Sequence, residues 1–196
     1  MNHHRSLSGY AATLLMLLAL AMLGAGCKKA PVEGRDIEND ARALQQFNKG
    51  VEAYVTLHSR AEKDMPHIKA TNSGAAIVKR QNTLAARVQK ARSKAKEGDV
   101  FTPEVSAYFR RQVDAAILGN RDGVEEALKA AAPGQQKITV NQPYPEDGPH
   151  VMMPPTILLH LPRLPELMQY DILGHDLILR DVECNLVVDV TRNVIP

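Results

Sequence analysis

The sequence predicts an α+β protein in which a hairpin or bundle of about four helices precedes a C-terminal antiparallel β-meander. Apolar residues recur at three- and four-residue steps in residues 36–132, prolines crowd residues 133–165, and apolar and polar residues alternate in residues 166–196. The first spacing is typical of amphipathic helices, and the alternation is typical of strands with one covered face. We therefore expect one domain over residues 36–196, with residues 133–165 as the crossover.

The first expected helix begins near Asp36 and ends before Pro66. Its acidic first turn and basic last turn suit the helix dipole. One apolar face is expected, formed by Ile37, Ala41, Leu44, Phe47, Val51 and Tyr54.

A second helix is expected over residues 75–97, folded back antiparallel on the first. Its expected seam consists of Ile77, Gln81, Leu84, Val88, Ala91 and Ala95. The same helix carries a run of cations, namely Lys79, Arg80, Arg87, Lys90, Arg92, Lys94 and Lys96. This run is either a patch for anionic lipid or polymer or a solvated helix face, and we favour the solvated face because cations suit a helix C-terminus.

A third helix is expected to start at Thr102 and Pro103, because Thr is a good N-cap and Pro is favoured at the first helical position. It should end at Gly119, with a short fourth helix over residues 122–132. In the proline-rich stretch we expect no helix, and short extended pieces at residues 138–140 and 156–161.

The tail is predicted to form three strands, with a turn at Gly174 and His175 between the first two. Its alternation places one set of residues toward the helices, namely Leu177, Leu179, Cys184, Leu186 and Val188. The carboxylates of the tail, Asp171, Asp176, Asp181 and Asp189, are expected at strand ends and on the outer face.

Composition argues against nucleic-acid binding. The formal net charge is +2, aromatic residues make up 4% of the chain, and there is no Trp. Nucleic-acid binders usually carry a clear basic excess, and single-strand binders need aromatic stacking platforms. We expect no nucleic-acid partner.

The N-terminus has the pattern of a secretory signal. A polar start containing Arg5 precedes a run over residues 11–23 that is apolar apart from Thr13. As a helix that run would span roughly 20 Å, which is less than the roughly 30 Å hydrocarbon core. Small residues follow it, as at a cleavage site, so residues 1–26 are predicted to be a leader that is removed.

The run Leu23-Gly24-Ala25-Gly26-Cys27 resembles the lipobox of bacterial lipoproteins. Ala25, Gly26 and Cys27 fit that pattern, whereas Gly24 stands where the family prefers a large aliphatic residue. The resemblance implies that the Cys27 thiol takes a diacylglyceryl group, that the leader is cut before it, and that the new amine is acylated, for instance with palmitate. It covers only the first 27 residues and implies nothing about the domain.

Lipidation at Cys27 would hold the chain firmly on a membrane, since two or more acyl chains bind stably. Residues 27–35 would then be a lipidated linker. In the enteric sorting pattern, Lys28 in place of Asp after the lipidated cysteine implies the periplasmic face of the outer membrane. Simple secretion and an uncleaved anchor are the alternatives. Cys184 would be left without a partner for an internal disulfide.

Few residues form a recognisable chemical motif. His58 and His67 are too far apart for a one-face helical pair, so no metal site is predicted there. The late histidines, His150, His160 and His175, could converge with Asp176. Cys184 could pair with His175 as a nucleophile, but its place on the apolar face favours a buried, inert thiol.

These patterns favour a lipid-anchored envelope protein with a non-enzymatic role, bound to another envelope protein or to a polymer. They predict no catalytic, cofactor-binding or metal-binding residue and no cofactor. The first alternative is a periplasmic metal-binding or metal-response protein that uses the late histidines. The second is an envelope hydrolase.

Overall fold

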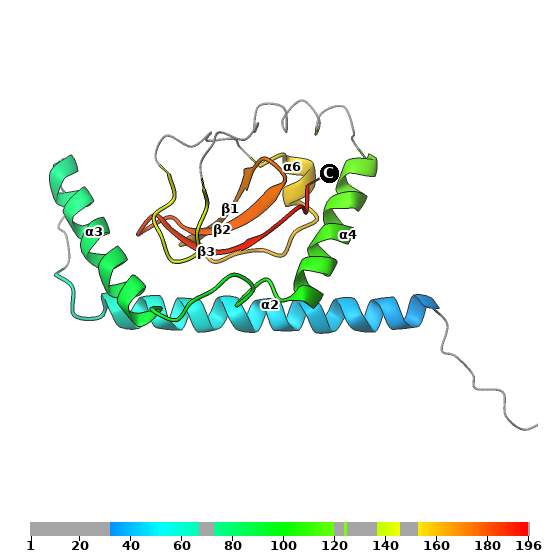
Figure 1. Cartoon of the computed structure of the whole chain (residues 1–196), viewed down its shortest axis with the longest axis horizontal. Helices are drawn as coiled ribbons and strands as arrows, with labels where there is room; N and C mark the ends of the chain where they lie inside the picture. Colours follow the sequence, from blue (N-terminus) through cyan, green and yellow to red (C-terminus); the bar gives the residue numbers. More distant parts are fainter. Residues whose placement is uncertain (1–31, 67–72, 120–123, 125–136, 146–152, 196) are drawn as a thin grey trace, which may run out of the picture. The chain divides into compact units, whose positions relative to one another are not determined.

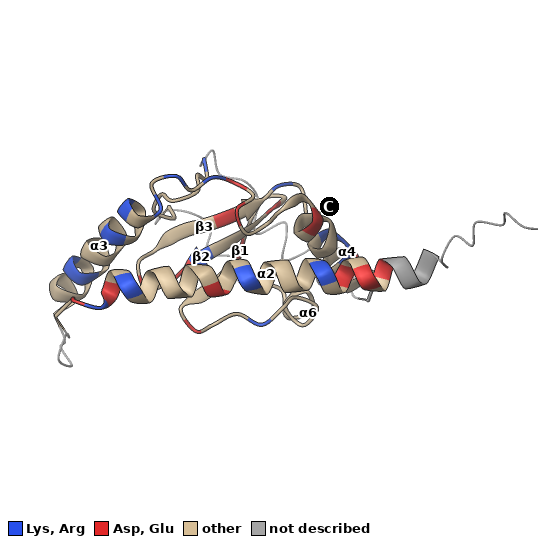
Figure 2. Cartoon of the chain, turned by 90° about the horizontal axis from the view of Figure 1, so that it is seen from below, with Lys and Arg blue, Asp and Glu red and all other residues tan. Residues whose placement is uncertain are grey.

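The computed structural model describes residues 32–66, 73–119, 124, 137–145 and 153–195. The chain divides into two compact units, Met1–Ile37 and Glu38–Pro196, and the second contains the whole sheet. Helices precede a three-stranded antiparallel sheet, so the predicted α+β class is confirmed. Helix α2 runs alongside the sheet, and α3 and α4 lie near the two ends of the sheet (Figures 1 and 2).

Helix α2 (Val32–Glu62) packs Phe47, Val51 and Tyr54 into the core, as their spacing predicts. It begins before the predicted Asp36, so the expected linker over residues 27–35 is helical from Val32 onward. The predicted apolar face is only partly right, because Ala43 is buried in place of Ala41.

Helix α3 (Gly74–Ala91) buries Leu84 and Val88 and is capped at its start by the Ser73 hydroxyl, which accepts from Ala76 N. The helix ends before the predicted Glu97, and Ile77 is 53% exposed. A long antiparallel hairpin with α2 is not confirmed, because α3 stands at a steep angle to α2 and does not run along it (Figure 1). The fully apolar seam that such packing needs is interrupted by Gln81 and ends at Ala91, which is exposed.

Helix α4 (Pro103–Gly119) confirms the third predicted helix, with Pro103 at its first position. The Thr102 hydroxyl accepts from Val105 N at 3.4 Å, as an N-cap does. Phe109 on this helix lies 4.9 Å from Phe47, centroid to centroid, and these rings join α4 to α2. The fourth predicted helix, over residues 122–132, lies outside the described residues except for Val124, which is helical and buried.

The sheet is the predicted meander, with strand order β1-β2-β3. Strand β1 is Met168–Leu173, β2 is Asp176–Asp181 and β3 is Leu186–Thr191. Met168 pairs with Asp181, and Asp181 pairs with Leu186, so one end of all three strands lies at the same level.

Both faces of the sheet are covered, which the sequence did not indicate. One face packs on the helices through Leu177, Leu179, Leu186 and Val188, together with Cys184 in the turn between β2 and β3, as predicted. The opposite face buries a second cluster of residues, namely Leu173, Ile178, Val187 and Val190, beneath Ile138 and Tyr144. The segment 137–145 is therefore a cover for the sheet, and Pro143 forms an isolated bridge with Leu186.

A β-bulge in β3 breaks the simple alternation. Leu179 pairs with Asp189 and Arg180 pairs with Val187, so Val188 is the extra residue. The bulge brings Asp189 to the helix-covered face, because it shifts the alternation by one position. The prediction that Asp189 lies on an outer face is therefore wrong, because its side chain is wholly buried. Asp181 lies at the end of β2, as predicted, but its side chain is also wholly buried.

The crossover contains a one-turn helix, α6 (Pro155–Leu158), where we expected an extended piece. Pro155 stands at its first turn, where the missing N–H costs nothing, so proline starts this helix and does not prevent it. Residues 137–139 have no regular structure, and Val140 lies in a turn.

Candidate metal centre

Helix α2 and the end of β2 bring four reactive side chains together inside the protein. Tyr54 and His58 lie one turn apart on α2 and face Asp181, the last residue of β2, and Cys184 in the following turn. Asp181 is wholly buried, and the other three side chains are between 2% and 4% exposed. Buried polar groups of this kind need partners, so their contacts decide what the cluster can do.

The Asp181 carboxylate is held in a fixed orientation. Tyr54 Oη donates to Oδ2 at 2.6 Å. The backbone N–H groups of Glu183 and Cys184 donate to Oδ1 at 2.9 and 3.1 Å, as in an Asx-turn. The turn thus holds Cys184 next to Asp181 within the cluster.

His58 is the member of the cluster whose polar atom is not satisfied. Its Nε2 lies 3.4 Å from Asp181 Oδ2 and 3.5 Å from Glu183 Oε2. Neither contact has hydrogen-bond geometry, so this buried nitrogen has no hydrogen-bond partner. Leaving such an atom unsatisfied costs about 1–3 kcal/mol, which a ligand at this point would recover.

Three metal-type donor atoms converge here, a His nitrogen, the Cys184 sulfur and an Asp181 oxygen, all within 4.8 Å of one another. A tetrahedral Zn²⁺ with bonds of about 2.0–2.3 Å separates its donors by about 3.5 Å. The 3.4 Å between His58 Nε2 and Asp181 Oδ2 already matches one edge of such a tetrahedron. The sulfur, nitrogen and oxygen set is one that zinc accepts.

A second donor group shares His58 and lies nearer the surface. His58, Glu62 and Glu183 also have ligand atoms within 4.8 Å of one another. The Glu183 side chain is 49% exposed and that of Glu62 is 39% exposed. Both carboxylates line a surface depression of about 400 Å³ together with Arg80, which forms an ion pair with Glu62.

The surroundings of the inner group, formed by His58, Asp181 and Cys184, keep the Cys184 thiol and the neighbouring Tyr54 hydroxyl protonated. Burial, and then the Asp181 charge, raises the pKa of the Cys184 thiol and of the Tyr54 hydroxyl above their usual ranges. The Arg92 guanidinium lies 5.1 Å from the Tyr54 ring centroid, and burial lowers its pKa. A thiol that retains its proton is a weak nucleophile, but a metal ion can displace that proton.

The histidines singled out from the sequence do not join this cluster. His160 is exposed, with Nδ1 2.8 Å from Thr156 O, and His175 Nδ1 lies 2.9 Å from Ile195 O. Among the described residues, neither belongs to a group of metal-type donors. Cys184 is buried as predicted, but its histidine neighbour is His58 and not His175. Cys27, His67 and His150 lie outside the described residues.

His58 could have been found from the sequence. Phe47, Val51 and Tyr54 are spaced by four and three residues, and His58 is the next member of that series. A histidine that continues an apolar face is expected to be buried, and a buried imidazole needs polar groups beside it. The partner itself was not predictable, because Asp181 and Cys184 lie in a distant part of the chain.

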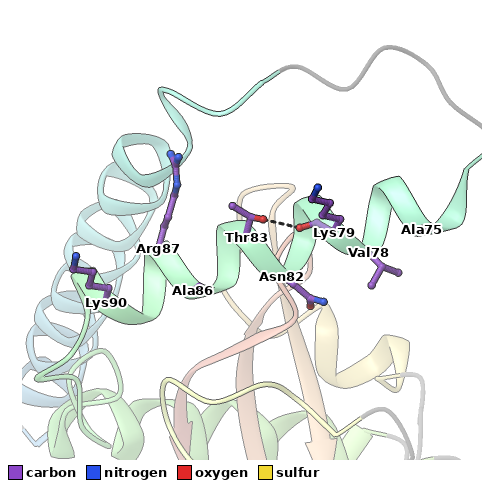
Figure 3. Close-up of a pocket in the computed structure, with 8 residues that line it drawn as sticks. All are labelled: Ala75, Val78, Lys79, Asn82, Thr83, Ala86, Arg87 and Lys90. Carbon is purple, nitrogen blue, oxygen red and sulfur yellow. Dashed lines mark hydrogen bonds between the residues drawn. The ribbon is translucent and has the colours of Figure 1, made fainter.

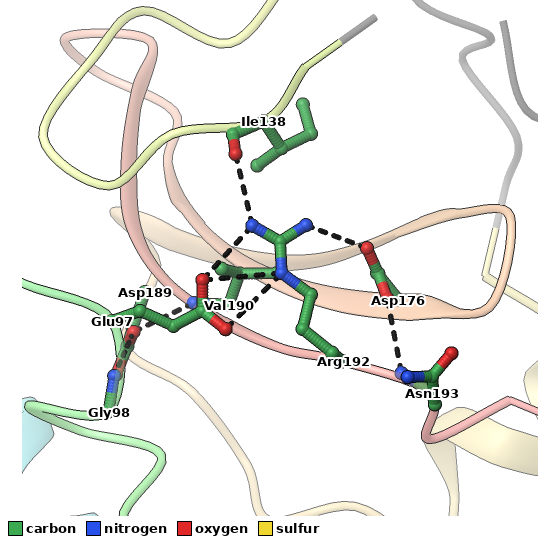
Figure 4. A network of polar contacts seen from close by, with 8 residues as sticks. All are labelled: Glu97, Gly98, Ile138, Asp176, Asp189, Val190, Arg192 and Asn193. Carbon is green, nitrogen blue, oxygen red and sulfur yellow. Dashed lines mark hydrogen bonds and ion pairs between the residues drawn. The ribbon is translucent and has the colours of Figure 1, made fainter. Parts of the chain in front are cut away.

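Arg192 links three segments in a second polar network (Figure 4). Its Nη1 donates to Asp176 at 2.7 Å, its Nη2 to Ile138 O at 3.1 Å, and its guanidinium pairs with Glu97. Asp189 beside it accepts from Gly98 N at 3.0 Å. The polar groups of this network are thus paired within the protein, and the contacts of Glu97 and Gly98 position the loop after α3 against β3.

The basic run of α3 is divided between contacts and solvent (Figures 2 and 3). Arg80 pairs with Glu62, Arg87 donates to Ala61 O, and Arg92 donates to Val188 O. Lys79 and Lys90 remain on an open face that they share with small residues such as Ala86. Exposed lysines fit both interpretations of the basic run, the solvated face and the patch for anionic lipid or polymer.

Comparison with known protein families, with curated proteins and with solved structures found no match. The helices that the structure describes include no candidate membrane span.

Proposed function

We propose that the folded domain binds a transition-metal ion, with Zn²⁺ as the best fit, through His58, Asp181 and Cys184. The observation that carries this proposal is the buried His58 Nε2, which has no hydrogen-bond partner and lies 3.4 Å from a fixed carboxylate oxygen. It takes up the metal-binding alternative from the sequence, with different residues from those expected there.

Charge balance supports a divalent ion at this point. The Asp181 carboxylate and a Cys184 thiolate together carry two negative charges, which a divalent cation neutralises. Burying these charges without such a partner is costly. The hydrogen bond from Tyr54 to Asp181 resembles the outer contacts that orient metal ligands in proteins.

The same geometry disfavours a hydrolase. A nucleophile needs a cleft in which substrate can reach it, and Cys184 and Asp181 are 2% and 0% exposed. The raised pKa of the Cys184 thiol also weakens it as a nucleophile. A small ion fits these surroundings better than a substrate does.

Equilibrium dialysis against Zn²⁺ tests the proposal on the chain purified in detergent. The parent is the Cys27→Ser chain, in which Cys184 is the remaining cysteine. We expect one ion bound per chain, with an affinity that falls about 100-fold or more in His58→Gln and Cys184→Ala, because each removes one of three ligands.

His160→Gln is the matched control, since it removes an exposed histidine outside the cluster. It should bind zinc like the parent. Thermal melts of all four chains without zinc show whether each is folded. Folded His58→Gln and Cys184→Ala chains that bind zinc like the parent would contradict the proposal.

We further propose that the chain is anchored by lipid at Cys27 on the periplasmic face of the outer membrane. The short apolar run, the small residues after it and the lipobox resemblance support this. Mass spectrometry of the membrane-extracted protein should show a chain that begins at acylated Cys27. Cys27→Ser should accumulate as unprocessed precursor, and normal processing with soluble release of that variant would refute lipidation.

The expected partner, another envelope protein or a polymer, also remains a proposal. Crosslinking in cells, followed by identification of what is captured, tests it. An anchored metal-binding domain could act through such a partner without being an enzyme.

A further inference from the structure

We infer that Glu62 and Glu183 form an entry site, from which a divalent cation passes to His58, Asp181 and Cys184. The inference rests on the proposed function of the inner group. It starts from the position of His58. The His58 ring belongs both to the outer donor group, with Glu62 and Glu183, and to the inner group, with Asp181 and Cys184. An ion can therefore move inward while it stays bound to a single imidazole.

The outer group is the exposed end of this route. Its two carboxylates line the depression of about 400 Å³, whereas Asp181 and Cys184 are buried and do not line it. Glu183 Oε2 lies 3.5 Å from His58 Nε2, about as close as Asp181 Oδ2 at 3.4 Å. The same ring nitrogen is thus within reach of a solvent-accessible carboxylate and of a buried one.

The chemistry of the two groups favours passage in one direction. Carboxylates capture hydrated cations without demanding full dehydration. The inner group is buried and adds a sulfur ligand, so it holds a borderline-soft ion such as Zn²⁺ more strongly. The ion exchanges the Glu62 and Glu183 oxygens for the Asp181 oxygen and the Cys184 sulfur, and the thiol proton leaves to solvent.

Arg80 controls this entrance electrostatically. It forms an ion pair with Glu62 and donates to Pro66 O at 3.1 Å, so its charge is held at the rim of the depression. Without a metal ion, the Glu62 carboxylate is therefore paired with the Arg80 guanidinium. An arriving metal ion has to compete with Arg80 for that carboxylate.

Stopped-flow zinc binding with a fluorescent zinc indicator tests this route in the Cys27→Ser chain. Glu183→Gln should slow both association and dissociation of zinc by roughly tenfold, because carboxylates that focus a cation set the rate of its arrival. The dissociation constant should stay unchanged, since the inner ligands are intact. Glu52→Gln is the control, because it removes an exposed carboxylate of α2 away from the depression.

Removal of Arg80 should have the opposite effect. Arg80→Ala frees Glu62 and removes a repelling charge, so association should become several-fold faster. Lys79→Ala, which removes an exposed cation from another face of the same helix, should leave the rate unchanged.

The outcomes separate the two proposals. Unchanged rates in Glu183→Gln would overturn the entry route while the inner site stands. A changed dissociation constant with unchanged association would also overturn it, because Glu183 would then be a permanent ligand. Absence of zinc binding in the parent would remove the proposed function itself, and the entry route with it.

Discussion

Deletion of residues 184–196 is expected to unfold the domain. Every residue of β3 is buried, and so are Val194 and Ile195 beyond it. The strand contributes Leu186 and Val188 to one core cluster and Val187 and Val190 to the other. Burial of each such side chain contributes about 1.5–3 kcal/mol, and a typical domain is stable by only about 5–15 kcal/mol.

Circular dichroism and thermal melting check this expectation. The truncated chain should lack a cooperative transition and should aggregate, because the deletion exposes the edge of β2. Deletion of residues 2–10 is the control, since it shortens the chain within the predicted leader, and it should leave the melt unchanged. A truncated chain that melts like its parent would show that the tail is peripheral.

Asp189→Asn should cost about 3–5 kcal/mol of unfolding free energy, which is large for a change that keeps the shape of the side chain. The carboxylate accepts from the backbone N–H groups of Gly98, Val100, Phe101 and Val190 at 2.7–3.0 Å. Two of these donors point at each oxygen. An amide replaces one oxygen by NH₂, so either rotamer leaves two buried N–H groups facing a donor.

Urea denaturation of Asp189→Asn measures this cost. Asp114→Asn is the matched control, because Asp114 is exposed on α4 and should change stability by under about 0.5 kcal/mol. Equal denaturation midpoints for the two variants would mean that Asp189 does not hold the loop after α3 in place.

Helices α2 and α4 and the three strands could be predicted because each depends on local spacing, whereas the one-turn helix α6 was expected to be extended. The pairing of Thr102 and Pro103 fixed the start of α4, and the alternation in residues 166–196 gave the meander. Asp189 was misplaced because a bulge at Val188 shifts the phase of β3, and a bulge has no local signature here. The cover formed by residues 137–145 was missed because it packs without regular structure.

The candidate site was not predictable as a unit, because its members come from α2 and from the end of β2. Asp181 appears in the sequence as one of several strand-end carboxylates, and only the fold distinguishes it from Asp176. The environment of Cys184 was predicted correctly, since alternation placed it on the buried face. The proximity of His58 to Cys184 depends on how α2 crosses the sheet, which no local pattern specifies.

The most direct test of the metal proposal is the absorption spectrum of the Cys27→Ser chain with Co²⁺ in place of zinc. Co²⁺ occupies zinc sites, and a bound thiolate gives it an intense sulfur-to-metal charge-transfer band in the near ultraviolet. We predict this band in the parent, its loss in Cys184→Ala, and its displacement by added Zn²⁺. A folded parent chain that shows no such band at saturating Co²⁺ would contradict a metal centre built on His58, Asp181 and Cys184.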